Sequence, residues 1–203
     1  MASGKNENGS EKGPVALLII DMISDFEFED SELLFRFVPE VAERIAALKA
    51  QAKKAGVPVI YINDNYGKWQ SDFKKLIEHC LTESERGREI VEKLLPDEDD
   101  YFVLKPKHSG FFFTTLEVLL DYLKVETLVL TGVAGNICIL FTASDAFMRD
   151  FKVIVPPDCI ASNTPELNEQ ALQQVKTVLD GRLIASTDLD WQALKQDQTA
   201  PAS

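Results

Sequence analysis

Short apolar runs alternate with longer amphipathic stretches along most of this chain. The run Val15–Ile20 is entirely apolar, which is typical of a central strand in a parallel sheet. Between residues 38 and 55 apolar positions recur three and four apart, and the pattern ends before Gly56, which predicts an amphipathic helix. The whole pattern predicts strands at 15–21, 57–62, 101–105, 126–131, 152–156 and 182–186. It predicts helices at 38–55, 71–81, 86–95, 113–123, 137–149 and 165–180.

Strands and helices that alternate in this way form a repeating βα unit. This predicts a three-layer, doubly wound α/β/α domain of Rossmann-like type, with a mainly parallel six-stranded sheet and right-handed crossovers. We expect residues 14–191 to form one domain, because no internal repeat or domain boundary interrupts the pattern. Residues 1–13 are small, polar and charged, which predicts a disordered N-terminal tail, and residues 192–203 predict a loose C-terminal tail.

Charge and hydropathy exclude some classes of partner. The chain has 203 residues, with 33 acidic against 21 basic side chains and a formal net charge of -12. A protein this acidic is a poor match for nucleic acid or for an anionic membrane surface. No apolar stretch reaches the roughly 18 residues of a membrane span, and no basic and then apolar leader is present. We therefore expect a cytoplasmic protein with no membrane partner.

The three cysteines, Cys80, Cys138 and Cys159, are odd in number and form no Cys-x-x-Cys pair. This argues against a disulfide framework or a structural zinc site. Cys138 alone follows an apolar strand and a glycine-containing turn, at the point where a helix begins. A thiol there is close to the positive end of the helix dipole, although a lone cysteine beside a helix is most often a small buried hydrophobe.

Two charged residues also stand where predicted strands end. Asp21 closes the first apolar run, and Lys105 closes the strand that precedes Pro106. Singly, Asp21 is an ordinary strand end and Lys105 an ordinary surface lysine. The carboxyl ends of parallel strands form the ligand-binding edge of such a sheet. We therefore expect Asp21, Lys105 and Cys138 to converge there.

The sequence around these three residues resembles the isochorismatase-like cysteine hydrolases, which include nicotinamidases and N-carbamoyl amidohydrolases. The resemblance extends over residues 15–186. The matching segments are Leu18–Met22 with Asp25–Phe26, Lys105–Phe111 with Thr115–Leu116, and Gly132–Cys138 with Thr142–Ala143 and Asp145–Ala146.

The resemblance implies a catalytic triad of Asp21, Lys105 and Cys138, and a cis peptide bond between Val133 and Ala134. It also implies the strand order 3-2-1-4-5-6. If that bond is cis, the backbone N–H groups of Ala134 and Cys138 are the candidates for an oxyanion hole. We further expect a homo-oligomer, either a dimer or a tetramer.

A carboxylate, an ammonium and a thiol at one site together predict hydrolysis of an amide. Asp21 takes the thiol proton, Lys105 stabilises the charged forms, and the thiolate attacks the carbonyl of a small amide or carbamoyl substrate to form a thioester. We expect Lys105 and the helix to hold the pKa of Cys138 below its reference value of about 8.5, with Asp21 opposing them. The alternatives are cleavage of a vinyl ether, as in isochorismatases, which needs no thiol, and a non-catalytic scaffold with a redox-sensitive Cys138.

The histidines argue against a metal cofactor. Nicotinamidases usually carry an Asp-x-His pair and a further histidine that hold a metal, whereas this chain has Asp64-Asn65-Tyr66 and only His79 and His108. We therefore predict no metal, no other cofactor and a substrate other than nicotinamide. His108, in the loop after Lys105, is a candidate pocket residue.

Several aromatic and amide side chains near the predicted strand ends are candidates for substrate binding, although each is also a plausible core or loop residue. Asp25 is expected to organise the first loop rather than to react. The candidates are Phe26, Asn63, Tyr66, Trp69, Phe111 and Asn136.

Overall fold

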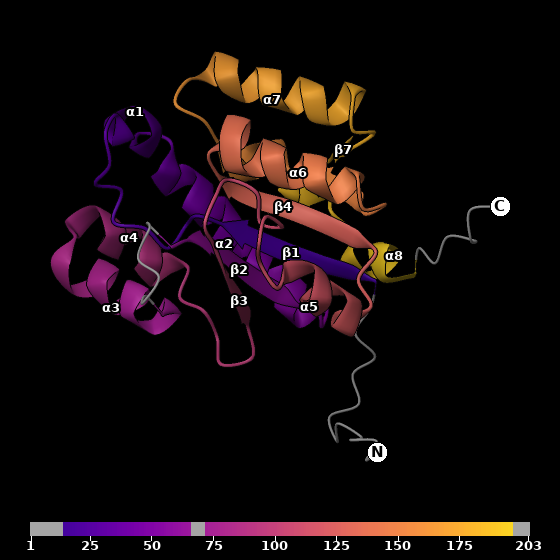
Figure 1. The fold of residues 1–203 in the computed structure, drawn as a ribbon, viewed down its shortest axis with the longest axis horizontal. Helices are drawn as coiled ribbons and strands as arrows, with labels where there is room; N and C mark the ends of the chain where they lie inside the picture. Colours follow the sequence, from indigo (N-terminus) through magenta and orange to yellow (C-terminus); the bar gives the residue numbers. More distant parts are fainter. Residues whose placement is uncertain (1–13, 66–71, 197–203) are drawn as a thin grey trace.

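The computed structural model describes residues 14–65 and 72–196. A parallel sheet forms its centre, with helices on both faces (Figure 1). The strands are β1 (Val15–Ile20), β2 (Val59–Asp64), β3 (Tyr101–Lys105), β4 (Thr127–Val133), β5 (Lys152–Val155), β6 (Ile160–Ala161) and β7 (Arg182–Leu183). The helices are α1 (Ser31–Phe35), α2 (Val38–Lys54), α3 (Phe73–Glu83), α4 (Glu85–Lys93), α5 (Leu116–Leu123), α6 (Leu140–Phe147), α7 (Pro165–Thr177) and α8 (Trp191–Gln196).

The strand order is β3-β2-β1-β4-β5-β7, and every pair in it is parallel. This confirms the three-layer fold and the predicted order, since β7 is the sixth strand that the sequence predicts. The two-residue strand β6 was not predicted, and it pairs with β4 beside the main path. It is too short for an alternating pattern to reveal it.

Alternate residues of β1 point to opposite faces of the sheet, as strand geometry requires. Leu17 and Ile19 join the core that contains buried residues of α2, α3, α4 and α8. Leu18 and Ile20 join the core with residues of α5, α6 and α7. Each such aliphatic side chain contributes about 1.5 to 3 kcal/mol when fully buried. The two helical layers therefore hold β1 and its carboxyl end rigidly.

The C-terminal boundary differs from the prediction. Residues from 192 onward were expected to form a loose tail, but α8 continues the fold to Gln196. Trp191 and Leu194 are buried in the core beside α2, because their spacing places both on the inner face of this short helix. Helix α1 was also not predicted, since five residues carry too little periodicity.

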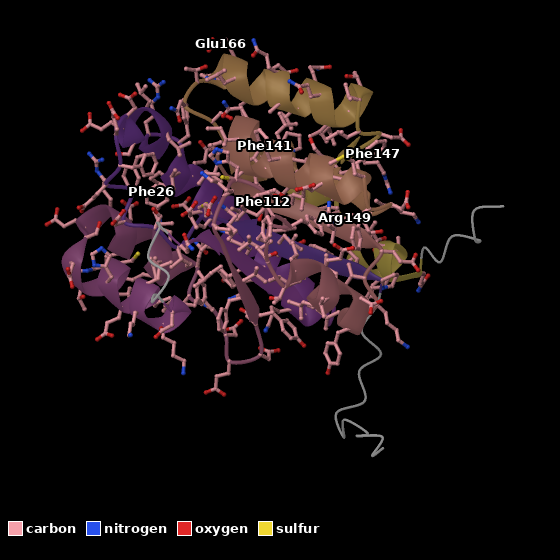
Figure 2. All side chains as sticks on the ribbon, viewed as in Figure 1. Phe26, Phe112, Phe141, Phe147, Arg149 and Glu166 are labelled. Carbon is pink, nitrogen blue, oxygen red and sulfur yellow. The ribbon has the colours of Figure 1, made fainter. Side chains whose placement is uncertain are left out.

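Exposed apolar side chains gather on and beside α6. Phe112, Phe141 and Phe147 are exposed and lie on or beside α6 in Figure 2, whereas the fully buried Phe26 lies on the side of the view toward α1. No helix among the described residues is long and apolar enough to span a bilayer. The homo-oligomer that we expect from the sequence stays a prediction.

Candidate active site

Asp21, Lys105 and Cys138 all lie at the carboxyl ends of strands. Asp21 follows β1, Lys105 is the last residue of β3, and Cys138 lies just after β4. Strand β2 separates β3 from β1, which places the backbones of Lys105 and Asp21 roughly 10 Å apart. The fully buried side chain of Lys105 spans this gap beneath the edge of the sheet.

The ammonium group of Lys105 is the centre of the cluster. Its Nζ lies 2.8 Å from Oδ2 of Asp21 and 3.5 Å from Sγ of Cys138. A third group, Oδ2 of Asp64, lies 3.7 Å from the same Nζ. The structure thus brings the three predicted residues together and adds Asp64. Sequence reasoning weighed Asp64 only as part of a metal motif, and the signal it missed is that β2 runs to Asp64, directly beside Lys105 in the sheet.

The backbone fixes the direction of the Asp21 carboxylate. Asp21 has a left-handed backbone with φ of 54°, and its N–H donates to the carbonyl of Ile62 at 2.8 Å. Its Oδ1 accepts a hydrogen bond from the N–H of Asp64 at 2.8 Å. Because Oδ1 is held by the neighbouring strand, Oδ2 is left to face Lys105.

Two glycines allow the turn that carries Cys138. Gly132 has φ of 111°, and a Cβ there would lie 2.0 Å from the carbonyl oxygen of Ile20, so no side chain fits. A Cβ on Gly135 would lie 2.5 Å from Oδ1 of Asn168. The peptide bond between Val133 and Ala134 is cis.

Cys138 lies in a single π-helical turn, Gly135–Ile139, that leads directly into α6. The carbonyl of Ala134 accepts hydrogen bonds from the N–H groups of Ile137 at 3.0 Å and Ile139 at 3.2 Å. The thiol therefore stands at the start of the helix, as the sequence predicts, although the first turn is wider than an α-helical turn.

The electrostatics differ from the prediction for the thiol. Burial raises the pKa of Cys138, the charge of Asp21 raises it further, and Lys105 only partly opposes them. The expectation of a lowered pKa is wrong because it left out the loss of water around the sulfur. Burial also raises the pKa of Asp21 against the effect of Lys105. For Lys105, burial lowers the pKa, but Asp21 and Cys138 outweigh it and the net shift is upward. The resting site therefore holds a lysine cation beside a protonated thiol.

A cavity of about 490 Å³ opens over this cluster. Its volume is in the usual range for a small-molecule site, and it lies where parallel sheets bind ligands. Among the described residues that form its wall are Asp21, Phe26, Asp64, His108, Ala134 and Cys138.

Comparison with known proteins identifies the family. The family described as "Isochorismatase domain" matches residues 15–187. The chain belongs to the isochorismatase family. It is 47% identical over 168 residues to the uncharacterized isochorismatase family protein YaaI of Bacillus subtilis (strain 168), covering 83% of this chain and 92% of that protein.

Two further relatives bear on the fold and the chemistry. Ureidoacrylate amidohydrolase RutB of Methylorubrum extorquens is 28% identical over 161 residues, covering 68% of this chain and 64% of that protein. The crystal structure of an isochorismatase family protein from Desulfovibrio vulgaris superposes with a TM-score of 0.68 at 28% identity, covering 87% of this chain and 96% of that one. Members of the isochorismatase family are hydrolases, and amidohydrolases are among them.

The predicted substrate-binding residues have different outcomes. Phe26 is fully buried and lines the cavity, and His108 lines it as well. Phe111 does not line it: it is packed in the core against Phe151, with the Arg149 guanidinium over its ring. The motif places Phe111 close to Lys105 in sequence, but the loop turns this ring inward because it is large and apolar. Tyr66 and Trp69 fall outside the described residues.

The two asparagine candidates support the site from behind the cavity wall. Asn63 is fully buried and its Nδ2 donates to the carbonyl of Ile23 at 2.9 Å, which holds the chain after β1. The backbone N–H of Asn136 donates to Oγ of Ser162 at 3.0 Å, which ties the π-helical turn to the segment after β6. Neither asparagine lines the cavity.

Asp25 organises the first loop. Its Oδ1 accepts a hydrogen bond from the N–H of Glu27 at 3.0 Å, and its Oδ2 lies 3.3 Å from Nε2 of His79. These contacts direct the Asp25 carboxylate toward α3 rather than toward Lys105. His79 is therefore a structural partner of the loop.

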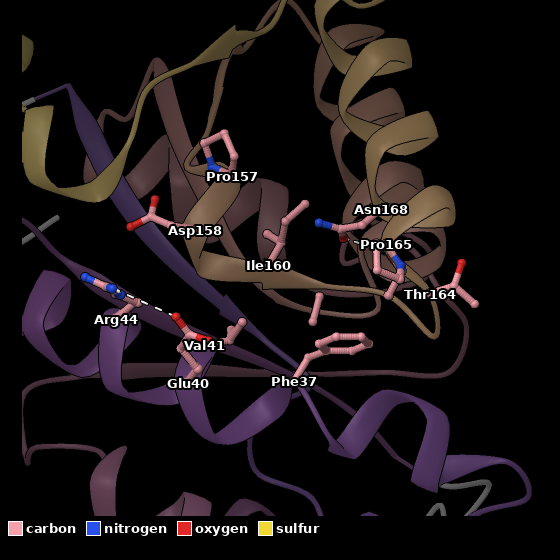
Figure 3. Close-up of a pocket in the computed structure, with 12 residues that line it drawn as sticks. Phe37, Glu40, Val41, Arg44, Pro157, Asp158, Ile160, Thr164, Pro165 and Asn168 are labelled. Atoms are coloured by element: carbon pink, nitrogen blue, oxygen red, sulfur yellow. Dashed lines mark hydrogen bonds and ion pairs between the residues drawn. The ribbon is translucent and has the colours of Figure 1, made fainter.

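A second hollow of about 260 Å³ lies between α2, β6 and the start of α7 (Figure 3). Several of its polar groups are already hydrogen-bonded: Oγ of Ser162 donates to Oδ1 of Asn168 at 3.0 Å, and Oγ1 of Thr164 accepts from the N–H of Leu167 at 3.3 Å. Arg44 and Glu40 form an ion pair at 3.9 Å, drawn as a dashed line in Figure 3. No cysteine, histidine or lysine is among the described residues of its wall, so it offers no counterpart of the Cys138 cluster.

Proposed function

We propose that the protein is a cysteine amidohydrolase that cleaves the C–N bond of a small amide or carbamoyl substrate through a thioester. The observation that carries this proposal is the contact of one buried ammonium, Lys105 Nζ, with both the Asp21 carboxylate and the Cys138 thiol at a cavity wall. A nucleophile beside a base, with a third group that orients both, is the arrangement that covalent catalysis requires. The similarity to an amidohydrolase of the same family supports it.

The raised pKa of Cys138 means that, in the first step, proton removal and attack by the sulfur occur together. Because the resting thiol is protonated, the thiolate forms only as Asp21 removes the proton while the sulfur attacks the carbonyl carbon. Asp21 and Cys138 both contact the same Lys105 ammonium, at 2.8 Å and 3.5 Å, so the proton has only a short distance to move between them. Lys105 stays charged and stabilises the negative charge that moves from the carboxylate to the sulfur.

The tetrahedral intermediate then needs donors for its oxyanion. The N–H groups of Ala134 and Cys138 are our candidates, because both residues form the cavity wall next to the thiol. One such donor contributes about 2.7 to 4 kcal/mol to the transition state.

The collapse of the intermediate completes the cycle. Asp21 returns its proton to the leaving nitrogen, the C–N bond breaks, and the acyl group remains on the sulfur as a thioester. Water, deprotonated by Asp21, then attacks the thioester, which releases the acid and restores the thiol. No step requires a metal or an oxidant.

A screen for ammonia release tests the proposal. The compounds are small primary amides, carbamoyl amines and ureido acids, assayed with the wild type and with Cys138→Ala. Cys80→Ala and Cys159→Ala are matched controls, because both cysteines are buried in the cores and neither lines the cavity. We expect Cys138→Ala to lose hydrolysis with its fold intact and the two controls to keep it. Equal activity in all three variants contradicts the assignment.

A further inference from the structure

The cavity wall has a one-sided charge. Four acidic residues, Asp21, Glu29, Asp30 and Asp64, are among its described residues, and no lysine or arginine is. Lys105 lies buried beneath the wall, where it is shared by Asp21 and Asp64. One cation therefore stands against four carboxyl groups.

Glu29 and Asp30 are the two carboxylates that Lys105 does not balance. They belong to residues 27–30, the exposed end of the loop between β1 and α1, and neither forms an ion pair with another described residue. Since they are exposed, they form the outer part of the wall, while Asp21 and Cys138 form its inner part.

The arginines of the same region are engaged elsewhere. Arg36 donates to the carbonyls of Leu33 and Asn163, each at 3.0 Å, and stacks on Phe37 at 4.8 Å. Arg86 pairs with Glu32 at 3.2 Å. Neither arginine is part of the described wall, so neither offers a partner to a carboxylate inside the cavity.

The rest of the described wall is largely apolar and includes Phe26, Phe28 and Leu34. Low-dielectric walls focus the field of the charges that they carry, so the cavity concentrates cations and repels anions. A substrate with a carboxylate tail would lose its hydration there without gaining a cationic partner.

We propose that the substrate is a small amide with a cationic tail, such as an ω-amino amide, whose carbonyl meets Cys138 and whose ammonium meets Glu29 and Asp30. This inference rests on the proposed function, whose nucleophile it uses. It separates this chain from its relative RutB, since ureidoacrylate is an anion. Glu29 and Asp30 are then specificity residues, with no role in bond breaking.

Labelling of Cys138 tests the charge of the cavity without any substrate. Two methanethiosulfonate reagents serve as probes, one with a cationic trimethylammonium-ethyl group and one with an anionic sulfonatoethyl group. Each is reacted with a Cys80→Ala/Cys159→Ala protein, in which Cys138 is the remaining thiol. The labelling rate of each probe is divided by the rate of the same probe with free cysteine, which removes the difference in intrinsic reactivity. We expect the cationic probe to be favoured by about tenfold or more at low ionic strength, and the preference to shrink with added salt. We expect the Glu29→Gln/Asp30→Asn variant to lose most of the preference.

Glu27→Gln is the matched control, because it removes a charge from the same loop outside the wall. No preference in the starting protein, or a preference that survives in Glu29→Gln/Asp30→Asn, overturns the inference.

A matched substrate series then separates the two proposals. The series is 4-aminobutanamide, pentanamide and succinamic acid, which share the amide and differ in the charge of the tail. We expect kcat/KM to fall in that order, and Glu29→Gln/Asp30→Asn to lower it for the cationic amide by about tenfold with little change in kcat. If succinamic acid is the best substrate, the inference fails and the amidohydrolase assignment stands. If no amide is hydrolysed but the cationic probe is favoured, the amidohydrolase assignment fails, while the preference of the cavity for cations is supported.

Discussion

Two clusters of lysines and aspartates stand at opposite edges of the sheet. At the carboxyl edge Lys105 contacts Asp21 and Asp64. At the amino edge, just before β3, Lys49 and Lys53 contact three aspartates. These are Asp97, Asp99 and Asp100, the group in the described part of the chain whose carboxylates come close enough together to hold a metal ion.

The residue types are the same, but the balance of partners differs. In the amino-edge cluster two lysines pair with three carboxylates, and the almost fully buried side chain of Asp100 accepts from Lys53 at 2.8 Å and from the N–H of Asp97 at 2.8 Å. At the carboxyl edge one lysine serves two carboxylates and a thiol beside a cavity. Lysine and aspartate therefore do not make a site by themselves. The thiol and the access of a ligand separate the reactive cluster from the structural one.

The largest expected effect comes from removing the central cation. In Lys105→Met the sulfur loses the positive charge that contacts it, so turnover should fall by about 10³-fold and the pKa of Cys138 should rise further. Iodoacetamide rates against pH and steady-state ammonia release measure the two effects. Lys53→Met is the matched control at the other cluster and should keep turnover. Near-normal turnover with an unchanged alkylation profile in Lys105→Met would make Lys105 a structural lysine as well.

Removing the base gives the opposite shift in pKa. Because the Asp21 charge raises the pKa of Cys138, Asp21→Asn should lower that pKa and let the thiol react with iodoacetamide at lower pH. Turnover should nevertheless fall by about 10² to 10⁴-fold, since the leaving nitrogen has lost its proton donor. An alkylation profile that moves the same way in Asp21→Asn and Lys105→Met contradicts the assigned roles.

The amino-edge cluster should affect stability and leave turnover alone. Asp100→Asn removes the buried charge that two lysines share, which should lower the free energy of unfolding by about 3 kcal/mol. Urea unfolding measures this, and ammonia release per folded molecule should match the wild type. Lost turnover in a stably folded Asp100→Asn protein would show that the two edges are not independent.

The smallest expected effect is that of a metal chelator, which should leave turnover unchanged. Of the histidines, only His108 lies in the described cavity wall, and the acidic group at the amino edge is engaged by Lys49 and Lys53. Treatment with a chelator should therefore leave turnover unchanged. Activity that disappears with the chelator and returns with added zinc or iron would show that a metal takes part.

The same contrast explains what the sequence could reveal. Asp21, Lys105 and Cys138 were predictable because each lies at or just beyond the end of an apolar run, and the strand order then brings them to one edge. The role of Asp64 was not predictable, because the contact of Asp64 with Lys105 depends on the length of β2 and on the register between β2 and β3. Phe111 was misplaced because a motif gives position along the chain and not the direction of a ring. The pKa of Cys138 was predicted with the wrong sign because burial is a property of the folded chain.

The central claim is that the acyl group is carried by the sulfur of Cys138. The most direct test is acid quenching of the enzyme during turnover of the best amide from the screen, followed by mass spectrometry of the intact chain and its peptides. The account predicts an added mass equal to the acyl group, labile to hydroxylamine and mapped to Cys138. An adduct on Cys80 or Cys159, or wild-type turnover by Cys138→Ala, would contradict it.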